Sequence, residues 1–272
     1  MMEGNFQMSN YENEEMLTGG NVSNVYRSGE TVRRELKPDS TNIHKLLKHL
    51  ENKGFSYAPK FLGIDEKGRE ILSFIEGEAG NYPVKEYMWS NAVLKEIAKM
   101  LRFYHDSVSD FVIEESWPSI DNTPQPFEVL CHNDFAIYNI IFNHKRPVGI
   151  IDFDFDVAGP GPRLWDIAYT LYTCVPLSRV YHSETGEAVY YHSLQCADHI
   201  KQRVELFFES YSGKMEEGYL EMVLLRLEGL CKTIKRKAKE GDSSFQKMIE
   251  EGHLEHYQND IKFIRKHGKE WI

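Results

Sequence analysis

The period of hydrophobic and polar positions changes along the chain and predicts two structural parts. Over residues 15–36, short apolar runs alternate with turns that contain glycine, which is typical of a β-meander. Residues 40–54 follow a helical period and end on a glycine. Two further strand-like runs at 58–63 and 70–74 complete a small α+β unit, whose boundary we place near Gly77.

The rest of the chain is predicted to be mostly helical. Apolar residues recur at helical spacing over 89–107, 197–210, 216–240 and 244–266. The predicted organisation is a loose N-terminus at 1–14, an N-terminal lobe at 15–77 and a larger C-terminal lobe at 78–272.

Composition and charge exclude several classes of protein. A formal net charge of −10 argues against a nucleic-acid partner, which needs clustered Lys and Arg, and favours encounter with cationic ligands. The 4 cysteines form no CxxC pair, so we expect reduced thiols rather than zinc or disulfides. The N-terminal residues lack the basic flank and apolar core of a signal peptide, and no apolar run is long enough to span a membrane. We therefore expect a cytoplasmic protein without a membrane contact, and no feature indicates a protein partner.

The most informative stretch is 129–172, where polar side chains follow apolar strand-like runs. His132, Asp134 and Asn139 come directly after the first run, and large apolar residues stand between them. These polar groups are thus expected inside a core. A buried carboxylate without a partner is costly, so Asp134 should have one.

The second run, residues 148–156, suggests a metal site. Asp152, Asp154 and Asp156 alternate with phenylalanines, which would place three carboxylates on one strand face. Like charges in that position repel unless a cation lies among them. Carboxylate oxygens and the Asn139 amide are hard donors, so they predict Mg²⁺ rather than zinc.

Signals for nucleotide binding in the first part are weaker. The turn at 19–24 contains two glycines that could bring backbone N–H groups close to phosphate, but it could equally be a plain hairpin. In the strand after it, Val32 and Arg34 share one face. Arg34 could face phosphates or simply be solvated, and the sequence pattern leaves both open.

Three motifs together resemble a known family. HNDFAIYN fits the pattern H-x-D-x-x-x-x-N, IIDFD follows it, and GPRLWDIAY comes next. The combination resembles the aminoglycoside phosphotransferase family and its choline-kinase relatives, over about residues 15 to 266. The resemblance implies a bilobal, α+β, protein-kinase-like fold with a small β-rich N-terminal lobe and a larger, mostly helical C-terminal lobe.

The resemblance also implies a function. It indicates a Mg-dependent O-phosphotransferase that moves the γ-phosphate of ATP or GTP to a hydroxyl of a small acceptor, aminoglycoside-like or otherwise, including cationic ones. Its partners would be the nucleotide and that acceptor. Two other classes compete: a catalytically weak kinase-fold protein of a binding or immunity type, and a metal-dependent hydrolase. The hydrolase is disfavoured because His132 and His144 lack ligand spacing with the aspartates.

The resemblance assigns roles to individual residues. Asp134 would accept the proton of the acceptor hydroxyl or orient it, and His132 and Asp166 would support the loop. Asn139 and Asp152 would hold Mg²⁺, with Asp154 helping a second metal or a cationic substrate. The residues assigned to nucleotide binding are Gly20, Ser23, Arg34, Ser73 and Ile75.

Departures from the family pattern concern Arg34. The family has a lysine at this position and pairs it with a glutamate on the next helix. That glutamate is missing here, since the inward helix positions are Ile43, His44 and Leu47. We therefore expect Arg34 to be held in another way or to swing free, with a different phosphate geometry.

Overall fold

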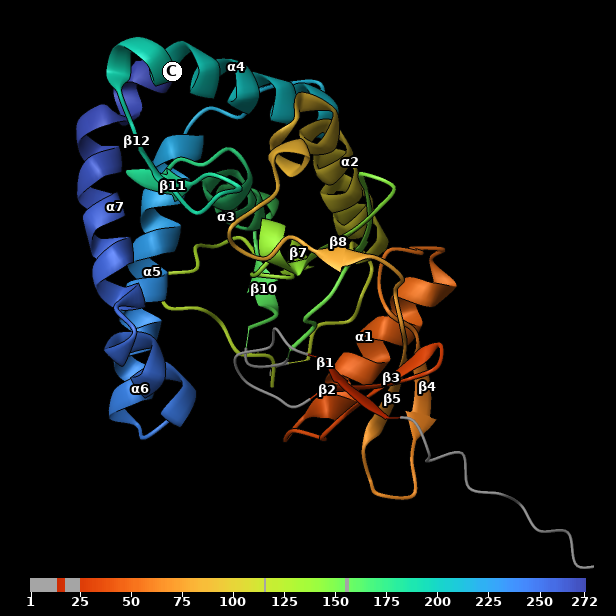
Figure 1. The fold of residues 1–272 in the computed structure, drawn as a ribbon. Coiled ribbons are helices and arrows are strands. Elements are labelled where there is room, and N and C mark those ends of the chain that lie inside the picture. The colour runs from red at the N-terminus through yellow and green to blue at the C-terminus, as the bar shows by residue number, and fades with distance from the viewer. Residues whose placement is uncertain (1–13, 18–24, 115, 155–156) are drawn as a thin grey trace, which may run out of the picture.

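A five-stranded antiparallel sheet and one helix form the N-terminal part of the computed structural model, which describes residues 14–17, 25–114, 116–154 and 157–272. The sheet order is β1-β2-β3-β5-β4, and Figure 1 shows the sheet with helix α1 beside it. The strands are β1 (Glu15–Leu17), β2 (Val25–Ser28), β3 (Thr31–Arg34), β4 (Phe61–Ile64) and β5 (Glu70–Ser73), and the helix is α1 (Ser40–Asn52).

The sheet register places two charged residues opposite each other. Strands β2 and β3 are joined by a tight turn through Gly29, whose φ of 60° is left-handed and free of the usual Cβ clash. Strand β3 then pairs with β5 so that Arg34 faces Glu70. Directly paired residues of opposite charge lie close enough to interact across the strands.

The C-terminal part is mostly helical and contains three small sheets. Their strand orders are β6-β8-β9, β7-β10 and β11-β12. In Figure 1, α4 to α7 lie on the side away from the N-terminal sheet. The helices are η1 (Glu86–Trp89), α2 (Asn91–Ser107), η2 (Ile137–Asn139), α3 (Arg163–Cys174), α4 (Ser193–Tyr211), α5 (Tyr219–Lys239), α6 (Ser243–Glu250), α7 (His253–His267) and η3 (Gly268–Trp271). The strands are β6 (Glu78–Ala79), β7 (Val129–Cys131), β8 (Ile140–Asn143), β9 (Arg146–Ile150), β10 (Gly159–Gly161), β11 (Val180–His182) and β12 (Ala188–Tyr190).

Buried apolar residues from both parts form the core. Helix α1 buries one face, and Phe55 after it packs against Phe103 and Tyr104 of α2. Strand β7 is fully buried, and its neighbour in the chain is the segment with the predicted site residues. This packing attaches that segment to a rigid base.

The predicted fold class is confirmed: the chain has a β-rich N-terminal part and a helical C-terminal part. The prediction of one helical segment over 244–266 was wrong, because the structure divides it into α6 and α7. The break falls at Gly252, whose φ of 82° is left-handed and ends the helical path. The domain boundary near Gly77 stays a prediction.

No helix among the described residues combines the length and apolar content needed to cross a bilayer.

Candidate active site

The segment after β7 turns sharply and is fixed by a buried carboxylate. Asn133 has a φ of 63°, which is uncommon for a residue other than glycine. The carboxylate of Asp166, fully buried in the first turn of α3, accepts hydrogen bonds of 2.8 Å from the backbone N–H groups of His132 and Asn133. The structure therefore places Asp166 where it supports the turn before Asp134.

His105 at the end of α2 holds Asp166 from the other side. Its Nε2 lies 3.2 Å from Asp166 Oδ2, and its Nδ1 lies 2.7 Å from the Tyr211 hydroxyl. Burial lowers the pKa of His105, so the neutral ring donates from Nε2 and accepts at Nδ1. Burial alone would raise the pKa of Asp166, but the hydrogen bond from His105 and the backbone donors keep this pKa below its ordinary value.

The carboxylate of Asp134 has two close partners. Its Oδ1 accepts a 2.6 Å hydrogen bond from the Tyr138 hydroxyl, and its Oδ2 accepts one of 2.7 Å from Asn139 Nδ2. Burial raises the pKa of Asp134, although both hydrogen bonds and nearby His132 oppose that shift. The sequence argument required a partner for this carboxylate, and the structure provides two.

Asn139 and Asp152 lie on neighbouring segments. The Asn139 carbonyl accepts a 2.9 Å hydrogen bond from the Ile151 N–H, which brings the two chain segments side by side. The Asn139 amide nitrogen is bound to Asp134, which leaves its side-chain oxygen without a hydrogen-bond partner among the described residues. About half of the Asp152 side chain is exposed, at 49%.

The prediction of a strand over 148–156 with three carboxylates on one face was wrong. Strand β9 ends at Ile150, and Asp152 has a φ of 66°, which reverses the alternation that a strand would continue. Asp156 lies outside the described residues. The protein around the half-exposed Asp152 carboxylate removes part of its hydration, and together with the charges of Asp154 and Asp134 this raises its pKa to about 7.

Asp154 is neutralised by two cations from the N-terminal part. Its Oδ1 lies 3.0 Å from Arg34 Nη1, and its Oδ2 lies 2.7 Å from Lys37 Nζ. Only 9% of the residue is exposed. A metal ion could use Asp154 only after displacing one of these cations, so it is the least available of the predicted metal ligands. Lys37 was not recognised from the sequence.

Arg34 does not swing free. Its Nε lies 2.5 Å from Glu70 Oε1, directly across the β3–β5 pair. The other oxygen of Glu70 lies 2.8 Å from His44 Nε2 on α1. Glu70 is 1% exposed. A glutamate on strand β5 therefore binds Arg34 in place of the missing helix glutamate, and the helix contributes a histidine.

The remaining predicted residues fall into three groups. His132 is 2% exposed; its Nε2 lies 3.2 Å from the Ile151 carbonyl, and its ring packs on Phe153 at 4.6 Å. In the segment 73–75, the N–H groups of Ser73 and Phe74 already donate to carbonyl oxygens, whereas Ile75 makes no such bond among the described residues. Gly20 and Ser23 lie outside the described residues.

Two comparisons of the sequence with known proteins show the family of this chain. The model of the phosphotransferase enzyme family (APH) matches residues 95–191. The trifolitoxin immunity protein of Rhizobium leguminosarum bv. trifolii is 34% identical over 216 residues, which cover 76% of this chain and 78% of that protein. The chain belongs to the phosphotransferase enzyme family.

Solved structures share the fold of this phosphotransferase-family chain at low sequence identity. Amicoumacin kinase hAmiN in complex with AMP-PNP, Ca²⁺ and Ami has a TM-score of 0.58 at 13% identity, and the match covers 88% of each chain. A choline/ethanolamine kinase family protein from Mesorhizobium loti has a TM-score of 0.54 at 14% identity, covering 93% of this chain and 94% of its own. ADP-bound APH(2'')-Ib has the same TM-score and identity, covering 96% and 94%.

One residue of this family member that the sequence analysis missed is Arg226 on α5. Its Nη2 donates a 2.6 Å hydrogen bond to the carbonyl of Asn133, and its guanidinium lies 4.5 Å from the centre of the Tyr169 ring. It is 1% exposed, and its Nε and Nη1 have no hydrogen-bond partner in the described ranges of the chain. The only available signal was an arginine at an apolar position of an amphipathic helix.

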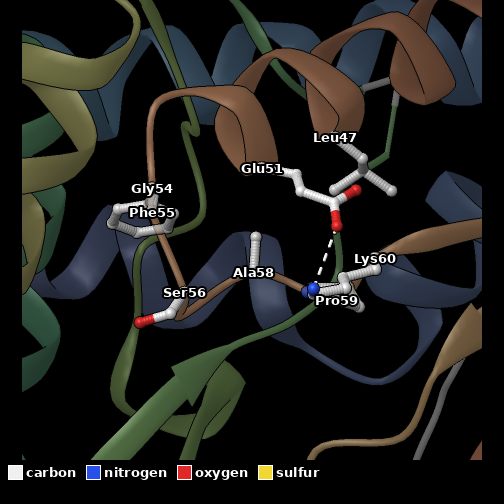
Figure 2. A pocket seen from close by; sticks show the side chains of 8 residues that line it. All are labelled: Leu47, Glu51, Gly54, Phe55, Ser56, Ala58, Pro59 and Lys60. Carbon is white, nitrogen blue, oxygen red and sulfur yellow. Dashed lines mark ion pairs between the residues drawn. The ribbon is translucent and has the colours of Figure 1, made fainter.

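Two pockets of the described surface lie away from these residues. The pocket in Figure 2 has a volume of about 150 Å³, lies between the end of α1 and β4, and is lined by Leu47 and Ala58 among others. An ion pair of 2.9 Å between Glu51 and Lys60 lies across it. No cluster of three or more His, Cys, Asp or Glu side chains arranged for a metal exists in the described part of the chain.

Acidification is expected to weaken the fold through His105. Burial lowers its pKa in the folded chain, whereas the unfolded chain keeps a value near 6.5. Below that pH the unfolded state binds more protons, so the free energy of unfolding falls as pH falls. One proton changes the free energy of unfolding by at most about 1.4 kcal/mol per pH unit. Denaturant unfolding between pH 8 and 5.5 measures this change, and the free energy of unfolding should depend less on pH in His105→Gln than in the wild type.

The matched control for this measurement is His253→Gln. His253 lies at the start of α7 with 41% of its side chain exposed. Its pH dependence should parallel that of the wild type. Parallel curves for His105→Gln and the wild type would mean that His105 does not bind fewer protons in the folded state.

Proposed function

We propose that the protein is a Mg-dependent small-molecule O-phosphotransferase that moves the γ-phosphate of ATP or GTP to a hydroxyl group. One observation carries this proposal. The Asp134 carboxylate is oriented by Asn139 beside Asp152, while Arg34 and Lys37 present positive charge from the N-terminal part. Transfer of a phosphoryl group needs such positioning and charge stabilisation rather than covalent chemistry by the protein.

The donor set fits a magnesium ion. Asn139 has a side-chain oxygen without a hydrogen-bond partner in the described part of the chain, and Asp152 has a half-exposed carboxylate. Both are hard oxygen donors, and Mg²⁺ in such proteins takes few protein ligands and keeps water and phosphate oxygens. We propose Asn139 and Asp152 as its ligands, with Asp154 in an accessory role. When bound, the ion would neutralise charge on the phosphate oxygens.

The nucleotide would lie between the two parts of the chain. We propose that Arg34 and Lys37 exchange Asp154 for the phosphates, since both cations reach toward the metal-ligand segment. The N–H of Ile75, which donates to no carbonyl among the described residues, suits pairing with the base, and we keep Ser73 of the same segment as a proposed contact. Gly20 and Ser23 stay proposed phosphate contacts. We keep 15–77 and 78–272 as the two lobes.

Asp134 would act on the acceptor. Its carboxylate would accept the hydroxyl proton as the acceptor oxygen attacks the γ-phosphorus, and its raised pKa makes it a better base than a solvated aspartate. We propose a small acceptor such as an aminoglycoside or another alcohol, and a cytoplasmic location. The formal charge of −10 favours a cationic one.

Sequence similarity supports a second candidate, an immunity function. The trifolitoxin immunity protein is 34% identical to this chain. The chain could protect a cell from an antimicrobial compound by phosphorylating it or by binding it. The two routes differ in whether Asp134 is needed.

Thermal unfolding with ATP or GTP, with and without Mg²⁺, tests the nucleotide site without knowledge of the acceptor. A ligand at a hundredfold excess over its Kd stabilises by about 2.7 kcal/mol, and each kcal/mol raises Tm by about 2–4 °C. The wild type should shift only with Mg²⁺ present.

Asp152→Asn should lose the shift, whereas Asp134→Asn should keep it and lose turnover by about 10²-fold or more. Normal turnover of Asp134→Asn would refute the assigned base.

Glu70→Gln should weaken nucleotide binding, because Arg34 loses the carboxylate with which it is paired. The neutral amide cannot balance the guanidinium, so Arg34 should shift toward Asp154 and Kd for the nucleotide should rise about tenfold. Titration calorimetry measures this change. Asp65→Asn is the control, because Asp65 pairs with Arg69 at 2.8 Å in the turn between β4 and β5, and no hydrogen bond or ion pair joins it to Arg34 among the described residues. An equal loss of affinity in both variants would indicate general damage to the sheet.

Expression in a host sensitive to an antimicrobial compound separates the two immunity routes. If protection depends on phosphorylation, Asp134→Asn at equal protein level should abolish it. If the protein protects by binding, Asp134→Asn should protect as well as the wild type, and purified protein should bind the compound without nucleotide.

A further inference from the structure

Asp134, the proposed base, already accepts a hydrogen bond from a hydroxyl group of the protein itself. Asn139 holds Oδ2, so the oxygen left for an acceptor hydroxyl is Oδ1. In this structure, Oδ1 accepts a 2.6 Å hydrogen bond from the phenol of Tyr138, four residues along the same loop. Tyr138 is only partly buried and packs at the edge of the apolar core. An acceptor must displace it to reach the base.

A chain of hydroxyl groups holds Tyr138 in this position. The Tyr138 oxygen lies 3.0 Å from the Tyr169 hydroxyl, which in turn lies 3.3 Å from the Tyr257 hydroxyl on α7. Each phenol has one proton, and Tyr138 uses its proton on Asp134. Tyr169 must then donate to Tyr138, and Tyr257 to Tyr169. Such a chain, ending at a charged acceptor, strengthens each of its hydrogen bonds.

We propose that Tyr138 is a specificity-determining residue whose phenol occupies the acceptor-hydroxyl position until an acceptor displaces it, and so keeps water from attacking bound nucleotide. The inference rests on the proposed phosphotransferase function. It adds that an acceptor must replace the Tyr138 hydrogen bond with one of its own.

The reaction that Tyr138 would suppress is hydrolysis of the nucleotide. A water oxygen would attack the γ-phosphorus and lose its proton to Asp134 Oδ1, and the bond from that phosphorus to the bridging oxygen would break. Inorganic phosphate and a nucleoside diphosphate would be released. While the phenol donates to Oδ1, it competes with water for this oxygen. The phenol itself is a poor nucleophile, because it is protonated and its proton is donated to Asp134.

Phosphate release from Mg·ATP or Mg·GTP without any acceptor tests the inference in the full-length protein. Tyr138→Phe removes the hydroxyl and keeps the ring, so hydrolysis should rise about tenfold, because a positioned base contributes 10²–10⁴-fold and water is less well placed than an acceptor. Adding Asp134→Asn to this variant should return the rate to the wild-type level. If Tyr138→Phe unfolds, Tyr138→Met provides the same test.

Tyr172→Phe is a matched control. Tyr172 lies on α3 and also donates a 2.6 Å hydrogen bond from its phenol to a buried carboxylate, that of Asp260. Tyr172 has no described hydrogen bond to Asp134 or Tyr138. This variant loses an equivalent bond, so its Tm should fall, but its hydrolysis rate should stay within about twofold of the wild type.

Three outcomes would overturn the inference, and they can be told apart. An unchanged hydrolysis rate in Tyr138→Phe, with the Mg-dependent thermal shift intact, would show that the phenol does not block the base. A phosphoryl group on Tyr138 in the mass spectrum of the wild type would make Tyr138 an acceptor and not a blocking residue. No thermal shift of the wild type with either nucleotide would overturn the proposed function, and the inference with it.

Discussion

The buried carboxylate of Asp166 is the contact on which the geometry around Asp134 depends. It binds two consecutive backbone N–H groups at the turn where Asn133 has left-handed φ, and a neutral histidine on α2 holds it from behind. A turn of this kind is unfavourable for a residue with a side chain, so it needs external support. Helices α2 and α3 provide this support, and Arg226 of α5 adds a hydrogen bond to the Asn133 carbonyl. The loop is thus fixed by three helices that are far apart in sequence.

Charge balance connects the two parts of the chain. The segment with Asp152 and Asp154 would repel itself, and cations from the N-terminal part relieve this repulsion in the absence of ligand. Glu70 is buried beside Arg34 and compensates part of that positive charge. Negative and positive side chains therefore alternate from Glu70 through Arg34 to Asp154. A metal ion and a nucleotide that bind here would replace existing ion pairs.

The motifs, through the family resemblance, were enough to predict the fold and the contact of Asp166 with the loop that precedes Asp134. His132, Asp134 and Asn139 lie close together because they belong to one short stretch, and their roles in catalysis and metal binding stay predictions. Contacts that depend on register or on distant helices could not be predicted. The pairing of Arg34 with Glu70 requires the strand order β3-β5, and Arg226 requires the packing of α5 on α3. The strand expected over 148–156 failed because the alternation of aspartate and phenylalanine resembles a strand, whereas the backbone reverses at Asp152.

The replacement of a helix glutamate by Glu70 changes how α1 is coupled to the site. An ion pair between a helix and the cation would make the position of the cation depend on the position of the helix. Here the anion comes from the neighbouring strand of the same sheet, so the Arg34–Glu70 contact is set by sheet register and does not need the helix. The helix is connected through one hydrogen bond of His44, whose ring also stacks on Phe61 at 3.7 Å. A movement of α1 could therefore break the His44 contact and leave Arg34 bound to Glu70. What phosphate binding requires is a fixed positive charge, and a cross-strand pair supplies it without a glutamate on the helix.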